Sequence, residues 1–160
     1  MDYKLLNQLN KKQINQLSIF LNDEDNMKRF IGKTFTNEKL KNMISFAKDD
    51  FKNEFKNIKY LYVVLLLNKD VIGIGVIMPY YLDTSINRLN VSVDSKYLNN
   101  GYENELIDVL LDLHYKFIKN TPLISIVEKN NKYYNKIFKK FEIKKKIKIN
   151  NKKLNVYQLL

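Results

Sequence analysis

The chain lacks cysteine altogether and contains a single histidine, His114. Without cysteine there can be no disulfide bond, no thiolate zinc site and no cysteine nucleophile. One histidine cannot build a histidine-rich metal site, and the sequence supplies no neighbouring triad partners for it. We therefore expect no bound metal. Because His114 belongs to an apolar helical stripe, a core position is favoured over a catalytic role.

Long apolar runs and flexible linkers are also missing. The longest apolar run, Leu61–Leu67, is far shorter than the roughly 20 residues that a membrane span needs. The first residues lack the charged-then-apolar order of a signal peptide, so we expect a cytoplasmic protein with no membrane partner. Two prolines, four glycines and no Pro/Gly/Ser-rich stretch predict a single domain over residues 1–160.

Lysine is what the chain has in excess. Residues Lys129–Lys153 hold eleven lysines and one acid, Glu142, so this segment carries nearly all of the net charge of +11. Such a field attracts an anionic partner, either a phosphorylated cofactor, nucleic acid or an acidic surface. A solvated lysine-rich face in a compositionally biased sequence explains it equally well. Nucleic acid is the weaker of these interpretations, because the only arginines are Arg29 and Arg88.

The first half of the chain is expected to form helices and then strands. Apolar residues at steps of three and four predict helices over Lys11–Leu21 and Asn37–Phe55, the second capped by Thr36. Apolar, β-rich runs predict a hairpin of Tyr60–Leu67 and Val71–Met78, joined by a turn that begins at Asn68. Alternating residues over Asn87–Val93 predict a third strand.

The second half is expected to begin with the main helix, Glu103–Asn120. A short strand, Leu123–Val127, and a helix capped by Asn130 or Asn131 and running to Phe141 follow. Strands over Ile143–Ile149 and Leu154–Leu160, joined by an Asn-Asn turn, close the chain. These elements define an α/β (α+β) class, with a mostly antiparallel mixed sheet of about six to seven strands flanked by about four helices.

Residues 91–103 form the most informative segment, a strand and loop leading directly into the main helix. Unpaired amides and the helix dipole make this arrangement suited to an anion. The segment resembles motif A of the GCN5-related N-acetyltransferase (GNAT) family, in which a strand valine leads into Arg/Gln-x-x-Gly-x-Gly/Ala. Val93 and Gly101 match the motif without a gap, while Leu98 replaces the Arg or Gln and Glu103 the last Gly or Ala.

A second stretch, Val127–Ile143, resembles motif B of the same family. Asn131 matches the motif asparagine and Ile137 its leucine. Phe138 stands where the family has a tyrosine whose hydroxyl protonates the leaving thiolate of CoA, and Glu142 stands where it has glycine. Tyr134, at the alanine position, has a hydroxyl, although helical geometry turns it away from position 138.

The resemblance covers nearly the whole chain and implies an N-acetyltransferase that transfers an acetyl group from acetyl-CoA to an amine by direct attack. The acceptor would be a small molecule or a peptide, and a homodimer stays open. Acetyl-CoA would lie between strands 91–93 and 123–127. The residues implied for its binding are Val91, Val93, Leu98, Asn99, Asn100, Gly101, Tyr102, Glu103 and Asn131.

No catalytic residue can be assigned from the sequence. Asp94, Asp83 and the pair Tyr80-Tyr81 are the candidates for acid–base work on the acceptor, and Tyr134 is a further catalytic candidate because it has a hydroxyl. For both aspartates an ordinary turn or loop role is at least as good an interpretation. The departures at Leu98, Glu103, Phe138 and Glu142 favour an alternative, a catalytically degenerate GNAT-fold binding or regulatory module.

Overall fold

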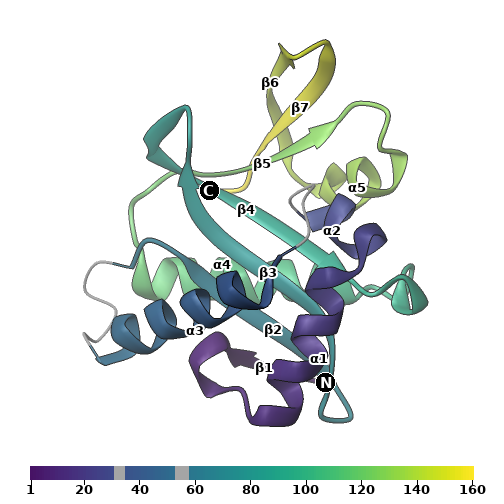
Figure 1. Ribbon diagram of the computed structural model, residues 1–160. Helices are drawn as coiled ribbons and strands as arrows, with labels where there is room; N and C mark the ends of the chain where they lie inside the picture. The colour runs from purple at the N-terminus through teal and green to yellow at the C-terminus, as the bar shows by residue number, and fades with distance from the viewer. Residues whose placement is uncertain (31–34, 53–57) are drawn as a thin grey trace. The chain divides into compact units, whose positions relative to one another are not determined.

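The computed structural model describes residues 1–30, 35–52 and 58–160 (Figure 1). The helices within them are α1 (Lys11–Asn22), α2 (Glu24–Phe30), α3 (Asn37–Lys52), α4 (Tyr102–Phe117) and α5 (Lys132–Ile137). The strands are β1 (Asp2–Leu5), β2 (Leu61–Leu67), β3 (Asp70–Tyr80), β4 (Asp83–Val93), β5 (Leu123–Glu128), β6 (Glu142–Ile149) and β7 (Lys152–Gln158).

These strands form one mixed sheet in the order β1-β2-β3-β4-β5-β7-β6. β4 and β5 are parallel, whereas β1 with β2, β2 with β3, β5 with β7 and β6 with β7 pair antiparallel. The α/β class and the mostly antiparallel mixed sheet expected from the sequence are therefore confirmed.

The chain folds as two compact units. The first unit comprises Met1–Ile77 and Asn90–Lys119, and the second comprises Met78–Leu89 and Asn120–Leu160. We describe each unit by itself. The single domain expected over residues 1–160 stays a prediction.

In the first unit, a glycine in β3 allows α4 to pack closely on the sheet. A Cβ atom at Gly75 would lie 2.5 Å from Leu110 Cδ1 and 3.2 Å from Leu106 Cγ. Both leucines are fully buried, so the main helix contributes its apolar stripe to the core as the periodicity predicts.

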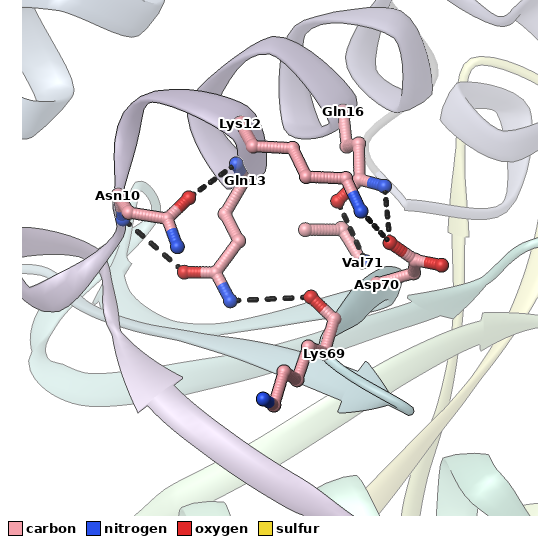
Figure 2. A network of polar contacts seen from close by, with 7 residues as sticks. All are labelled: Asn10, Lys12, Gln13, Gln16, Lys69, Asp70 and Val71. Carbon is pink, nitrogen blue, oxygen red and sulfur yellow. Dashed lines mark hydrogen bonds and ion pairs between the residues drawn. The ribbon is translucent and has the colours of Figure 1, made fainter.

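A polar network attaches α1 to the β2–β3 turn of the same unit (Figure 2). The buried Gln13 donates to the Lys69 carbonyl at 3.2 Å, and its Oε1 accepts from the Asn10 N–H at 3.1 Å. Asp70 accepts from Lys12 Nζ at 2.8 Å and from Gln16 Nε2 at 2.7 Å. The turn, which needs positive φ at Lys69, is therefore held by side chains from a helix far away in sequence.

The second unit has its own small apolar core. Tyr80, Ile124 and Val156 are buried together, and Ile86, Ile126 and Ile147 pack against them. Strand β6 forms the edge of the sheet, and most of its residues are exposed. Exposed lysines on an edge strand disfavour pairing with another chain, which gives the lysines of β6 a structural explanation.

Several element boundaries differ from the expectation. Strand β1 and helix α2 were not predicted, and the main helix ends at Phe117 because Lys119 and Asn120 adopt positive φ. Helix α5 ends at Ile137 and continues only as a 3₁₀ turn over Phe138–Lys140. The last residues of the predicted helix Asn37–Phe55, from position 53 on, lie outside the described residues.

Candidate functional site

The end of β4 brings buried valines to the start of a loop. Val91 is 2% exposed and Val93 is fully buried. Gly73 of β3 lies against this end, since a Cβ atom there would be 2.9 Å from the Ser92 carbonyl oxygen. Because the valine side chains are packed inside, only the strand's backbone is suited to contact a ligand at this place.

The loop after β4 is fixed by Asp94. The Asp94 N–H donates to the Ile72 carbonyl at 2.8 Å, and its carboxylate accepts from the Lys96 N–H at 3.0 Å, which caps the 3₁₀ turn Ser95–Tyr97. This carboxylate therefore has a structural role in the loop. That Asp94 also acts as a general base stays a prediction.

The following residues turn sharply into α4. Asn99 has φ 66° and Gly101 has φ 85°, the left-handed region that glycine adopts without strain. The Asn100 side chain donates to the carbonyls of Tyr97 at 3.0 Å and Leu98 at 3.3 Å. A Cβ atom at Gly101 would meet no atom within 4 Å, so the space above this residue is open.

This turn leaves backbone donors at the start of the helix. Within the described residues, the N–H groups of Leu98, Asn100, Gly101 and Tyr102 donate to no protein group. Together with the helix dipole they favour an anion at this place. Glu103 is 2% exposed, so its carboxylate is buried in the protein rather than presented on the open side of the loop.

Helix α2 supplies a residue that sequence reasoning missed. Arg29 Nη2 donates to the Val93 carbonyl at 3.3 Å and to Asn26 Oδ1 at 2.6 Å, while Ser92 Oγ donates to the Asn26 carbonyl at 2.9 Å. These bonds attach α2 to the end of β4. Because α2 was not predicted, the sequence pointed to Arg29 only through the rarity of arginine in this chain.

A cavity of about 280 Å³ adjoins this loop in the first unit. Its walls come from α1, from the start of α2, from β3 and from the Asp94–Lys96 turn, and they include Asp23, Asn26 and Asp94.

In the second unit, the stretch that resembles motif B is organised around two asparagines. Asn131 caps α5 by accepting from the Tyr134 N–H at 3.1 Å, and Tyr134 is buried. Asn135 Nδ2 donates to the carbonyls of Glu128 at 2.8 Å and Asn131 at 2.6 Å. Phe138 is buried and has no hydroxyl to offer.

Asp83, another candidate of the sequence analysis, lies exposed at the start of β4 in the second unit. Its Oδ1 accepts from the Ser85 N–H at 3.0 Å and from Ser85 Oγ at 2.6 Å. These two hydrogen bonds hold the pKa of the Asp83 carboxyl below its usual value.

The predicted site residues thus divide between the units. Val91, Val93, Asp94 and residues 98–103 form one continuous strand–loop–helix in the first, whereas Asp83, Asn131 and Tyr134 belong to the second.

His114 is 2% exposed on α4, and burial lowers the pKa of its imidazole. A lowered pKa keeps the ring neutral at physiological pH. No three metal-binding side chains gather in the part of the chain that the structure describes. Among the same residues, no helix is long and apolar enough to cross a membrane.

No protein-family profile matches the chain, and no curated protein matches it in sequence. Solved structures do match in shape. A ribosomal-protein-S5-alanine acetyltransferase from Vibrio fischeri is 14% identical with a TM-score of 0.76, covering 99% of this chain and 91% of that one.

Two further structures extend the comparison. A GNAT-family acetyltransferase from Streptococcus pneumoniae is 16% identical with a TM-score of 0.72, covering 98% of each chain. A spermidine N-acetyltransferase chimera from Vibrio cholerae and hSSAT is 10% identical with a TM-score of 0.69, covering 100% of this chain and 96% of that one. The chain therefore has the GNAT fold, in a form highly divergent in sequence.

Proposed function

We propose that the protein is an N-acetyltransferase that uses acetyl-CoA as the acetyl donor and an amine as the acceptor. The observation that carries this proposal is the set of N–H groups at the start of α4, which lack a protein partner among the described residues and lie beside an open Gly101. Preorganised backbone donors of this kind suit the pyrophosphate of CoA. The fold, shared with acetyltransferases of different acceptors, supports the same class.

In this proposal the acceptor's nitrogen attacks the thioester carbonyl directly, so that a C–N bond forms and the C–S bond breaks. The departing thiolate needs a proton. Phe138 cannot supply one, so we propose that water does. The base that takes the proton from the amine is unassigned, with Asp94, Asp83 and Tyr134 as candidates. The cytoplasmic location expected from the sequence belongs to the same proposal.

A second candidate function is a binding or regulatory module that keeps the fold without the reaction. Leu98 removes a polar contact to phosphate that the motif provides, and Phe138 and Glu142 depart from motif B. The buried position of Glu103 weakens one argument for this alternative, because its carboxylate does not stand on the open side of the loop.

Isothermal titration with acetyl-CoA and with CoA distinguishes the acetyltransferase from the binding or regulatory module. We expect micromolar binding to the wild-type protein, loss of binding in Gly101→Trp, and retention in Gly101→Asn. Asn tolerates the left-handed backbone and is much smaller than Trp, so it controls for the loss of glycine. Absence of binding at millimolar acetyl-CoA would remove the enzyme proposal. Binding without CoA release against a broad panel of amines would favour the module.

A further inference from the structure

The second unit carries almost all of the net positive charge of the chain. Its residues include twelve lysines and arginines against three acids, Asp83, Glu128 and Glu142, whereas the first unit has sixteen against fourteen. A bias in composition would add lysine to both units alike, but only in the first unit are the cations balanced by acids. The excess is therefore a property of the second unit and not of the sequence as a whole.

The lysines are densest on the β6–β7 hairpin, which is yellow in Figure 1. Residues 144–153 contain six lysines and no acid, and all six lysines are exposed. They are Lys144, Lys145, Lys146, Lys148, Lys152 and Lys153. Among these six, and within the residues that the structure describes, only Lys152 forms an ion pair, with Glu128. The hairpin is thus a ribbon of largely uncompensated cations.

Two of these lysines lie directly opposite each other across the hairpin. Lys148 pairs in register with Lys153, and Lys146, two residues earlier on β6, lies on the same face of the strand. Residues that are directly opposite have Cβ atoms about 4.5–5.5 Å apart, and like charges in such a pair are destabilising. An anion bound at this face would relieve the repulsion.

Protection of the sheet edge explains only the lysines of β6. Strand β7 lies between β5 and β6 in the sheet, so both of its edges are already paired. Lys152 and Lys153 of β7 therefore protect no edge. Because Lys153 is one of the two residues in the opposed pair, the repulsion itself is not a by-product of edge protection.

A concavity adjoins the turn of the hairpin. It has a volume of about 560 Å³, and its walls are Glu128, Lys129 and Asn130 after β5 together with Asn151, Lys152 and Lys153 of the turn. The Lys129 N–H donates to the Lys153 carbonyl at 2.8 Å and holds the two segments together. Three lysines and two asparagines border this space, and the single acid among its walls is already paired with Lys152.

We propose that the β6–β7 hairpin and this concavity bind the phosphate backbone of a nucleic acid without reading its sequence. Residues on one face of a strand repeat every ~6.6–6.8 Å, and such a row of cations suits a chain of regularly spaced phosphates. Lysine contacts phosphate as a point charge. The scarcity of arginine, which made nucleic acid the weaker interpretation of the sequence, bears on base recognition and not on backbone binding.

A nucleic acid fits this surface better than an acidic membrane does. The tip of the hairpin is Asn150-Asn151, so it offers no apolar side chain for insertion into a bilayer. The proposed binding goes beyond the acetyltransferase reaction and needs neither acetyl-CoA nor an amine, so the failure of either proposal leaves the other standing.

Fluorescence anisotropy with labelled single strands of about 16 nucleotides, DNA and RNA, tests the proposal on the full chain between about 0.05 and 0.2 M salt. We expect a dissociation constant on the order of 1–100 µM at about 0.15 M salt, equal for strands of unrelated sequence. The logarithm of the affinity should fall linearly with that of the salt concentration, with a slope of about −0.7 for each phosphate contact.

A pair of double variants locates the contact. Lys148→Gln with Lys153→Gln should make the salt slope shallower by about 1.4 and weaken binding by about 10- to 30-fold near 0.1 M salt. Lys41→Gln with Lys48→Gln removes two exposed lysines from α3 of the first unit and lowers the net charge equally. This control should leave both quantities nearly unchanged.

Unfolding in urea shows that a loss of binding does not come from a loss of structure. Because Lys148→Gln and Lys153→Gln each remove the repulsion, either variant should unfold at a higher urea concentration than the wild type, most clearly at low salt. A lower midpoint in both single variants would contradict the opposed pair on which the inference rests.

Four outcomes would overturn the inference. They are no saturable binding of any strand at about 0.05 M salt, affinity that does not depend on salt, equal weakening in the Lys41 and Lys48 control, and tighter binding of another polyanion. Poly-glutamate and vesicles rich in phosphatidylglycerol are the polyanions compared. Preference for either one over nucleic acid would assign the lysines to an acidic protein or to a membrane.

Discussion

The Tyr157 hydroxyl donates to Asn135 Oδ1 at 2.7 Å while its ring stacks on Phe138, with centroids 5.7 Å apart. Asn135 Oδ1 also accepts from Asn155 Nδ2 at 2.8 Å. Because Asn135 Nδ2 also donates to the Glu128 carbonyl at 2.8 Å, this one side chain of α5 joins both β7 and the end of β5. The Tyr157 ring that stacks on Phe138 therefore carries a hydroxyl that is already engaged within the protein.

Replacing Asn135 by Ala should destabilise the protein by about 2–3 kcal/mol, because several hydrogen bonds are lost and the partly buried groups around it become unsatisfied. Tyr157→Phe removes one hydrogen bond and keeps the ring, so it should cost about 1 kcal/mol. Urea unfolding measures both. Equal effects of the two substitutions would show that Asn135 does not act as the centre of this network.

The two glycines of β3 should differ in their tolerance of alanine. At Gly73 the new Cβ would lie 2.9 Å from the Ser92 backbone oxygen, which cannot move alone, whereas at Gly75 it meets the flexible end of Leu110. We expect Gly73→Ala to cost about 2–3 kcal/mol and Gly75→Ala about 1 kcal/mol. Thermal unfolding decides the order, and a larger loss for Gly75→Ala would contradict the packing described at both positions.

Asp70 should make the stability dependent on acid pH. Its hydrogen bond with Lys12, then that with Gln16, lowers the pKa of the Asp70 carboxyl. A lowered folded-state pKa contributes stability above the unfolded value of about 3.9, and this contribution is lost as pH falls through the folded value. Asp70→Asn should therefore lower the free energy of unfolding at pH 7. The difference in this free energy between the variant and the wild type should become smaller near pH 2. A constant difference across this range would disprove the linkage.

The Tyr62 phenol should lose its proton only at unusually high pH. Burial, and secondarily the neighbouring Tyr60, raises the pKa of the Tyr62 phenol to about 12. Since the neutral phenol is favoured in the fold, stability is complete below the unfolded pKa of about 10 and falls as pH rises to about 12, by on the order of 2 kcal/mol. Comparison of wild type and Tyr62→Phe by unfolding at pH 9 and pH 12 isolates this group. If the phenolate absorbance assigned to Tyr62, from the difference between wild type and Tyr62→Phe, is complete by pH 10.5, the raised pKa of Tyr62 is refuted.

Features set by local chemistry were predictable from the sequence. Thr36 Oγ1 accepts from the Lys39 N–H at 3.2 Å, as the predicted cap requires. Asn150 and Asn151 adopt the positive φ values that an Asn-Asn turn favours. These residues determine their own backbone conformation, so no knowledge of distant contacts was needed.

Features that depend on tertiary contacts were not predictable. β1 has only four residues and is defined by its pairing with β2. α2 has seven residues, and the only local sequence signal for it is the possible capping residue Asp23, whose carboxylate accepts from the Asn26 N–H at 2.8 Å. The contact of Arg29 with the Val93 carbonyl needs α2 to reach β4, which no local pattern encodes.

Leu98 offers a way to test the motif A assignment by gain of function. It is partly exposed, and it stands where the motif has Arg or Gln. A cation placed there would add a charge-assisted contact to pyrophosphate, so Leu98→Arg should tighten acetyl-CoA binding by about tenfold and Leu98→Glu should weaken it. Calorimetry at two salt concentrations measures both. Unchanged affinity in both variants would place the phosphates elsewhere.

The most direct test of the account is an NMR titration of the ¹⁵N-labelled protein with acetyl-CoA, following the backbone amides of the loop. We predict that the signals of Leu98, Asn100, Gly101 and Tyr102 shift downfield together with one dissociation constant, because these N–H groups gain hydrogen bonds to phosphate oxygens, while amides of β6 stay in place. Saturable binding that leaves these four signals unmoved would contradict the central claim, even if the protein acetylates an amine.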